Sequence, residues 1–369
     1  MPSLPELLRR PVPRRVHGGL VEDELVALGV DPATVLDVST SVNPYGPTPS
    51  MVRAVREARL ELYPDPTAAA SRAAIAASAG TTPDRVVLGN GATDLLWTLA
   101  RLLLAPGETL LVCEPSFSEL RVAAEAGGAR VVAWRAQASD GFVLDVDRVA
   151  RSARLERASA VALCAPGSPS GAATPVADVA RLARTLGERA LIVDQSFLAL
   201  SERHAELSMR LPANVVCVRS LTKEHAIAGV RVGYAVAEPP LAERIEASRA
   251  AWTVGAAAQA AAIAAARDDG FVAASRERLL GERARLADAL AERGFRTLPS
   301  TTPYFLVEVG DAAAFRARLV TEHGILVRDC ASFGLPAFVR LAARGGPDAQ
   351  RIAGAFAALG RDAARCPGA

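Results

Sequence analysis

From Val86 onward, short apolar runs alternate with segments of helical pattern, and this alternation constrains the fold more than any other feature of the chain. Runs that are apolar throughout are typical of strands buried on both faces, which occur mainly in parallel sheets. The helical segments between them supply the crossover connections that parallel strands require. We therefore predict an α/β fold with a mostly parallel, seven-stranded sheet covered by helices. Strands are expected at 86–88, 109–113, 130–134, 160–164, 191–194, 215–219 and 232–237, with helices between them at 94–104, 117–126 and 176–186.

After Pro240 the pattern changes to long helical segments, followed by a second group of short apolar runs. This order is typical of an α+β unit. We predict an N-terminal arm at 1–45 that packs on the small domain, a large domain at 46–250 and a small C-terminal domain at 251–369. Further helices are expected at 51–62, 241–252, 255–266, 270–293, 312–322 and 347–359, and further strands at 304–309, 325–327 and 338–342.

The composition argues against several classes of partner. The 369 residues include 42 basic and 40 acidic residues, for a formal net charge of +2. Since no run of basic residues forms a patch, we expect no nucleic-acid partner. No apolar stretch has the length of a membrane span and the N-terminus lacks a signal-peptide core, so we expect a cytoplasmic protein without membrane contact. Scattered cysteines without a CxxC pair indicate reduced thiols and no metal site: Cys113, Cys164, Cys217, Cys330 and Cys366.

The segment 218–234 carries the first candidate site. It places Lys223 directly after an apolar run, beside Ser220 and Thr222, with Arg231 further along. A lysine amine can form a Schiff base with an aldehyde, and two hydroxyls with a guanidinium can hold a phosphate. This grouping suits an anionic cofactor joined through an imine. A surface lysine after an edge strand is the alternative.

Other candidate residues lie at the ends of neighbouring predicted strands, where ligands of open α/β sheets bind. Asp194 ends a buried run, so its carboxylate needs a partner such as a cationic ring nitrogen, or else it caps a helix or loop. Phe117 offers a ring for stacking on a flat heterocycle, or closes the core. The turn 89–93 exposes backbone N–H groups at a helix N-terminus, which favours phosphate, or is only a tight connection. Arg340 interrupts an apolar run and needs an anion, either a substrate carboxylate or an ion-pair partner.

Taken in order, these residues resemble those of fold-type I pyridoxal-phosphate enzymes of the class I/II aminotransferase family, over nearly the whole chain from about His17. The resemblance implies the fold-type I architecture, a homodimer and pyridoxal 5'-phosphate as cofactor. It also implies that Lys223 forms the Schiff base and shuttles the substrate proton, and that Asp194 keeps the ring nitrogen protonated. The implied cofactor-binding residues are Gly91, Ala92, Thr93, Phe117, Ser168, Asp194, Phe197, Ser220, Thr222, Lys223 and Arg231, with Tyr63 arriving from the partner subunit.

Within this family the chain is similar to histidinol-phosphate aminotransferases and, nearer still, to the threonine-phosphate decarboxylases of cobalamin synthesis. The second similarity rests on His17-Gly18-Gly19, the stretch 41–47, the stretch 252–254 and the segment 328–335. It implies a small amino substrate that carries a phosphate. Arg340 is expected to bind the substrate carboxylate, with Arg328, Asn43 and His17 as further substrate-binding candidates. A solvated arginine and a turn histidine are the alternatives.

Two residues depart from the family pattern. Ser168 stands in a Pro-Gly-Ser-Pro-Ser-Gly loop where relatives have Asn, and Phe197 stands where many have Tyr. Both family residues donate hydrogen bonds to the oxygen of the cofactor's ring hydroxyl. Losing these donors leaves negative charge on that oxygen less stabilised, so we predict a raised pKa of the imine.

Three functions are compatible with these residues. In amino transfer, Lys223 removes the Cα proton and the amino group passes to a 2-oxo acid. In decarboxylation of an amino-acid phosphate, the carboxylate leaves instead, and the bond that stands perpendicular to the cofactor ring decides between the two. The third is a cofactor-binding protein with little catalysis, favoured by Ser168 and Phe197 but opposed by the presence of Lys223 and Asp194.

Overall fold

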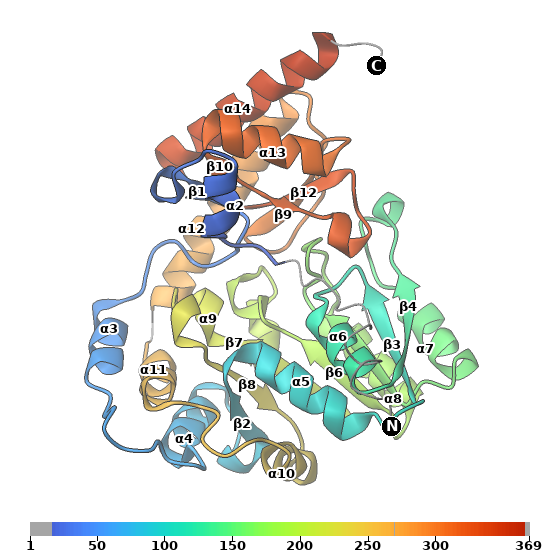
Figure 1. Cartoon of the computed structure of the whole chain (residues 1–369). Coiled ribbons are helices and arrows are strands. Elements are labelled where there is room, and N and C mark those ends of the chain that lie inside the picture. The colour runs from blue at the N-terminus through green and yellow to red at the C-terminus, as the bar shows by residue number, and fades with distance from the viewer. Residues whose placement is uncertain (1–16, 269, 366–369) are drawn as a thin grey trace, which may run out of the picture.

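The computed structural model describes residues 17–268 and 270–365 (Figure 1). Its largest sheet has seven strands in the order β2-β8-β7-β6-β5-β3-β4. Strand β8 runs antiparallel to its neighbours β2 and β7, and the other pairs are parallel. The predicted mostly parallel sheet is therefore confirmed. Its strands are β2 (Val86–Gly89), β3 (Thr109–Glu114), β4 (Arg130–Arg135), β5 (Ala160–Cys164), β6 (Ala190–Asp194), β7 (Val215–Ser220) and β8 (Gly233–Val236).

Helices cover both faces of this sheet, because its strands carry apolar side chains on alternate sides. On one face, Ile192 and Val218 pack with α5 (Gly91–Leu103), α6 (Glu119–Ala126) and α10 (Pro239–Ala247). On the other face, Leu191 and Val193 pack with α7 (Val146–Leu155) and α8 (Val176–Leu186). The end of the sheet at β2 packs with α3 (Pro49–Arg56), α4 (Ala69–Ser78) and α11 (Ala256–Ala266).

A second unit is built on a three-stranded antiparallel sheet (Figure 1). Its strands are β11 (Arg328–Asp329), β12 (Phe338–Ala342) and β9 (Tyr304–Glu308), and its helices are α12 (Phe271–Ala291), α13 (Ala312–His323) and α14 (Gly346–Arg365).

The N-terminal segment lies against this second unit. It contains α2 (Glu22–Ala27) and β1 (Leu36–Asp37), and β1 pairs in parallel with β10 (Ile325–Leu326). Glu24 accepts hydrogen bonds from the Arg316 guanidinium at 2.7 and 3.0 Å. Figure 1 shows this segment, in blue, beside β10 and α13. The domain boundaries near residues 45 and 250 stay a prediction.

Several element bounds differ from those expected, for local reasons. Helix α3 begins before residue 51 because Thr48 caps it and Pro49 fits the first turn, and it ends at Arg56 rather than 62. Helix α10 ends at Ala247 rather than 252, and Trp252 has a left-handed φ of 55°. Helices α4 and α7 were not among those expected, although Asp145 caps α7 with two hydrogen bonds.

The buried cysteines are thiols. Cys113, Cys164, Cys217 and Cys330 are free and buried, and Cys366 lies outside the described residues. Burial raises the pKa of the Cys217 thiol to about 11, so it stays protonated at neutral pH. Within residues 17–268 and 270–365, no helix has both the length and the apolar character to cross a membrane. The same residues contain no cluster of three or more side chains suited to a metal ion.

Candidate functional site

A cavity of about 640 Å³ lies at the carboxyl ends of the central strands. Asp194 is the last residue of β6, Cys164 is the last of β5, and Lys223 lies in α9 (Leu221–Glu224), directly after β7. The N-terminal segment and the pair β11–β12 contribute further lining. The sequence-predicted residues that line this cavity are His17, Thr93, Phe117, Ser168, Asp194, Phe197, Thr222, Lys223, Arg231, Arg328 and Arg340.

Lys223 is the single lysine in the chain. Its carbonyl accepts a hydrogen bond from the Asn43 N–H at 2.9 Å, and the Asn43 side-chain amide donates to the Glu224 carbonyl at 2.9 Å. Lys223 Nζ lies 4.1 Å from the centre of the Phe197 ring. Burial lowers the pKa of the Lys223 ammonium, and the Asp194 carboxylate opposes this shift. The lowered pKa increases the neutral fraction of the amine and so its nucleophilicity.

Asp194 and Cys164 lie side by side, since they are register partners in the parallel pair β5–β6. Asp194 Oδ1 accepts a hydrogen bond from the Ser196 N–H at 2.8 Å, which orients the carboxylate. Burial, and next the Asp194 charge, raise the pKa of the Cys164 thiol to about 12. The thiol therefore stays protonated and does not compete with Lys223 as a nucleophile.

Anion-binding groups gather at the N-terminus of α5. The hydroxyls of Ser220 and Thr222 are 2.7 Å apart, and Arg231 donates to the Ala228 carbonyl at 3.0 Å. Gly91 begins α5 with φ +77°, and a Cβ there would lie 2.5 Å from Arg231 Nη2. The guanidinium therefore packs directly against the first turn of the helix, where backbone N–H groups favour a phosphate.

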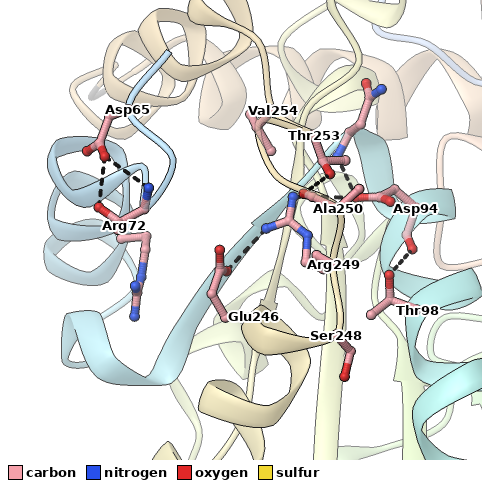
Figure 2. Close-up of polar contacts among 12 residues, drawn as sticks. Asp65, Arg72, Asp94, Thr98, Glu246, Ser248, Arg249, Ala250, Thr253 and Val254 are labelled. Atoms are coloured by element: carbon pink, nitrogen blue, oxygen red, sulfur yellow. Dashed lines mark hydrogen bonds and ion pairs between the residues drawn. The ribbon is translucent and has the colours of Figure 1, made fainter. Parts of the chain in front are cut away.

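Asp94, in the same turn, links the cavity to the loop that follows α10 (Figure 2). Its Oδ2 accepts a hydrogen bond from the Asn90 N–H at 3.0 Å and lies 3.6 Å from Arg249 Nη2. The Arg249 side chain is 7% exposed and also pairs with Glu246 at 3.1 Å. Figure 2 shows Arg249 between Glu246 and Asp94, close to Ala250 and Thr253. The loop is thus tied to the start of α5.

Arg328 and Arg340 are register partners in the antiparallel pair β11–β12, so their side chains lie on the same face. Arg340 is buried; its Nη2 donates to the Ser39 carbonyl at 2.7 Å, and its Nη1 lies 3.5 Å from Ser168 Oγ. Burial, and next the Arg340 charge, lower the pKa of Arg328. Two guanidinium groups at one wall of a cavity favour the binding of anions.

Some predicted site residues lie outside the lining of the cavity: Gly91, Ala92, Ser220, Asn43 and Tyr63. The first three flank the cavity. Gly91 lies against the lining residue Arg231, Ser220 bonds the lining residue Thr222, and Ala92 lies between Gly91 and Thr93 at the start of α5. Asn43 is only 2% exposed, and its side chain bonds the backbone at Glu224 and Tyr45. Tyr63 is 81% exposed, and its ring is tilted by 33° against that of Trp252, with ring centres 4.8 Å apart.

Glu119 is the main lining residue that the sequence reasoning missed. It is 3% exposed and accepts hydrogen bonds from Trp97 Nε1 at 2.7 Å and from His17 Nε2 at 2.8 Å. The available signal was a carboxylate two residues after Phe117, at the start of a helix that follows a strand end. Further lining residues without a predicted role include Thr40, Ser41, Asp94, Cys164 and Phe333.

The cavity fits an anionic aldehyde cofactor with a ring nitrogen. Among the described residues, Ser41 Oγ and Arg340 Nε are buried without a hydrogen-bond partner, and a bound anion would satisfy both. Gly91 lets the Arg231 guanidinium lie against the α5 N-terminus, because a side chain at residue 91 would meet it. The lining thus combines the Lys223 amine, the Asp194 carboxylate and several groups suited to phosphate or carboxylate oxygens.

Comparison with known proteins agrees with this geometry. A family model described as aminotransferase class I and II matches residues 33–359. Histidinol-phosphate aminotransferase 1 of Thiobacillus denitrificans is 32% identical over 322 residues, which cover 85% of this chain and 82% of that protein. The histidinol-phosphate aminotransferase from Sinorhizobium meliloti, solved in complex with pyridoxal-5'-phosphate, superposes with a TM-score of 0.87 at 24% identity over 98% of both chains. The L-threonine-O-3-phosphate decarboxylase from Porphyromonas gingivalis superposes with a TM-score of 0.77 at 24% identity, over 88% of this chain and 99% of that one.

Proposed function

Because the chain belongs to the family of class I and II aminotransferases and is a pyridoxal-phosphate-dependent enzyme, we propose that it transfers the amino group of a phosphorylated amine to a 2-oxo acid. The proposed substrate class rests on one observation, that Arg328 and Arg340 lie together in the cavity that contains Lys223. A substrate carboxylate needs one guanidinium, so the second is suited to a further anion such as a phosphate. The relatives named for histidinol phosphate support the same class.

The roles of the residues follow from their chemistry. The bound cofactor supplies an electron sink that stabilises negative charge on the carbon next to the substrate nitrogen. Lys223 would hold the cofactor aldehyde, and its amine, when free, would take the substrate proton as a base. Asp194 would stabilise the protonated ring nitrogen. Arg231, Thr222 and the first turn of α5 would hold the phosphate of the cofactor.

A panel of amines tests this function. The purified holoenzyme is incubated with histidinol phosphate, with threonine phosphate and with their unphosphorylated forms, each with 2-oxoglutarate, and products are read by mass spectrometry. We expect amine loss from a phosphorylated donor. Loss of CO2 from threonine phosphate would assign the decarboxylase activity of a structural neighbour instead. An enzyme that leaves every phosphorylated amine unchanged would rule out the proposed substrate class.

We expect Gly91→Ala to weaken binding of the cofactor. The added Cβ meets Arg231 and also disfavours the φ of +77°. Displacing Arg231 weakens its charge-assisted contact with the cofactor phosphate, and a hydrogen bond to a charged group contributes about 1.5–3 kcal/mol, so the dissociation constant should rise by roughly tenfold or more. Titrating the apoenzyme with pyridoxal phosphate measures this by absorbance. Gly294→Ala is the matched control, since Gly294 has φ +87° and no heavy atom within 4 Å of its would-be Cβ; equal binding by both variants would contradict the assignment.

We expect Phe197→Tyr to lower the pKa of the imine that joins Lys223 to the cofactor. The ring of Phe197 already lies beside Lys223 Nζ, so a phenol hydroxyl there can donate a hydrogen bond to the ring oxygen of the cofactor. The measurement is a pH titration of the cofactor absorbance in both proteins. Phe333→Tyr, elsewhere in the same cavity, is the control. A wild-type imine pKa in the usual range of the family, unchanged by Phe197→Tyr, would refute the effect.

A homodimer completes the proposed assembly. Leu60, Leu62, Tyr63 and Trp252 are large apolar side chains with half or more of their surface exposed. Monomeric proteins rarely expose several large apolar side chains in one patch. The ring contact between Tyr63 and Trp252 makes two of these side chains contiguous. A second copy that covers this patch would bring Tyr63 towards the partner's cavity. Sedimentation should give a dimer that Trp252→Glu weakens, and a monomeric wild type would exclude it. The free thiols support a cytoplasmic location, which is part of the same proposal.

A further inference from the structure

Glu119 is a buried carboxylate in a cavity that otherwise suits anions. Taking a carboxylate out of water is costly unless hydrogen bonds compensate it. Both of its oxygens are used: Trp97 Nε1 donates to Oε2 at 2.7 Å, and His17 Nε2 bonds Oε1 at 2.8 Å. The Trp97 contact comes from α5, within the same unit as Glu119. The contact with His17 reaches across 102 residues to the N-terminal segment.

His17 is held in a defined orientation by this contact. Its ring centre lies 5.4 Å from that of Phe117, and its side chain is 40% exposed. Since Nε2 donates to Glu119, Nδ1 is the ring nitrogen that is left for a substrate, and it donates to a phosphate oxygen when the ring carries a proton on both nitrogens. His17 and Arg328 line the same cavity, from the N-terminal segment and from β11 respectively. A phosphate of the substrate bound there would accept hydrogen bonds from both segments.

We propose that Glu119 is a positioning residue that sets the preference for phosphorylated substrates, by holding His17 at the cavity wall with Nδ1 available to the substrate phosphate. The inference rests on the proposed function, because it concerns the substrate of the same cavity. Glu119 itself acts through His17 and repels an anion, so its own carboxylate is not a phosphate ligand. Trp97 orients the carboxylate for this purpose.

The test measures binding to the holoenzyme of threonine phosphate and of threonine, read from the change in cofactor absorbance. Glu119→Gln keeps an oxygen acceptor for Trp97 but removes the negative charge that faces His17, so the doubly protonated ring that donates from Nδ1 loses its partner. We expect its dissociation constant for threonine phosphate to rise roughly tenfold, the net effect of a hydrogen bond to a charged group. The dissociation constant for threonine and the cofactor absorbance should not change. Glu125→Gln is the matched control, on the same helix but paired with Arg121 outside the cavity.

A double-mutant cycle separates positioning from a structural role. If Glu119 acts through His17, Glu119→Gln has no further effect in a His17→Ala background. Additive effects, or equal loss of affinity for threonine phosphate and threonine, would overturn the inference. His17→Ala also keeps the test decisive if Glu119→Gln folds poorly, because the His17 side chain is partly exposed and its removal leaves the core intact.

Different results refute the proposed function and this inference. A wild-type enzyme that binds threonine phosphate and threonine equally overturns the inference while leaving the aminotransferase reaction in place. A wild-type enzyme that turns over no phosphorylated amine, but binds one more tightly through His17 and Glu119, refutes the proposed function and supports the inference.

Discussion

Replacing Lys223 with alanine is expected to abolish turnover and retention of the cofactor together. The variant loses both the amine that holds the cofactor and the base that moves the substrate proton. General acid–base catalysis alone contributes about 10²- to 10⁴-fold, so kcat should fall by roughly 10⁴-fold or more. Turnover is measured with the amine panel, and cofactor retention is read from absorbance after gel filtration.

The single lysine makes this prediction unusually specific. Because no other lysine exists in the chain, borohydride reduction of the holoenzyme should attach the cofactor to one lysine-containing peptide. Mass spectrometry identifies that peptide, and it should be absent in Lys223→Ala. Lys223→Arg keeps a positive charge without a primary amine and should lose activity to the same extent. Attachment at the N-terminal amine instead would contradict the assignment.

Arg340→Ala is expected to impair only those half-reactions whose substrate carries a carboxylate. Removing one partner of a buried charge pair costs about 2–5 kcal/mol, which corresponds to roughly 30- to 4,000-fold in kcat/KM. Glutamate or 2-oxoglutarate should therefore react far more slowly, because the buried Arg340 lines the cavity and its Nε has no hydrogen-bond partner among the described residues. Histidinol phosphate carries no carboxylate, so its half-reaction should retain most of its rate. Stopped-flow absorbance of the cofactor measures each half-reaction separately.

Two further variants define the cause of this effect. Arg340→Lys keeps the charge but loses the two-pronged geometry, and should lie between wild type and Arg340→Ala. Arg296→Ala removes an exposed arginine that pairs with Glu308, and should change neither half-reaction. Equal loss of both half-reactions in Arg340→Ala would show that Arg340 supports the fold of the cavity rather than the carboxylate.

Much of the fold could be predicted because its signals are local. The uninterrupted apolar runs that became β5, β6 and β7 are short enough to be read directly, and their continuous burial implies a sheet covered on both faces. The position of the cavity followed from one rule, that ligands of such sheets bind at the carboxyl ends of strands. Helix α7 shows the opposite case. Its capping residue Asp145 is visible in the sequence, but polar residues interrupt its apolar ones, so that its helical residues form no apolar run.

The sequence by itself determined the type and order of the elements, the strand-end location of Lys223 and Asp194, and the presence of one lysine. Periodicity and strand ends are properties of a few consecutive residues, so no tertiary information is needed to find them. Only the tertiary structure decided which distant side chains meet. The bonds of Glu119 to Trp97 and His17, and the backbone contacts of Asn43 beside Lys223, depend on how separate segments pack. Residue spacing along the chain carries no signal for such contacts, because packing between elements sets them.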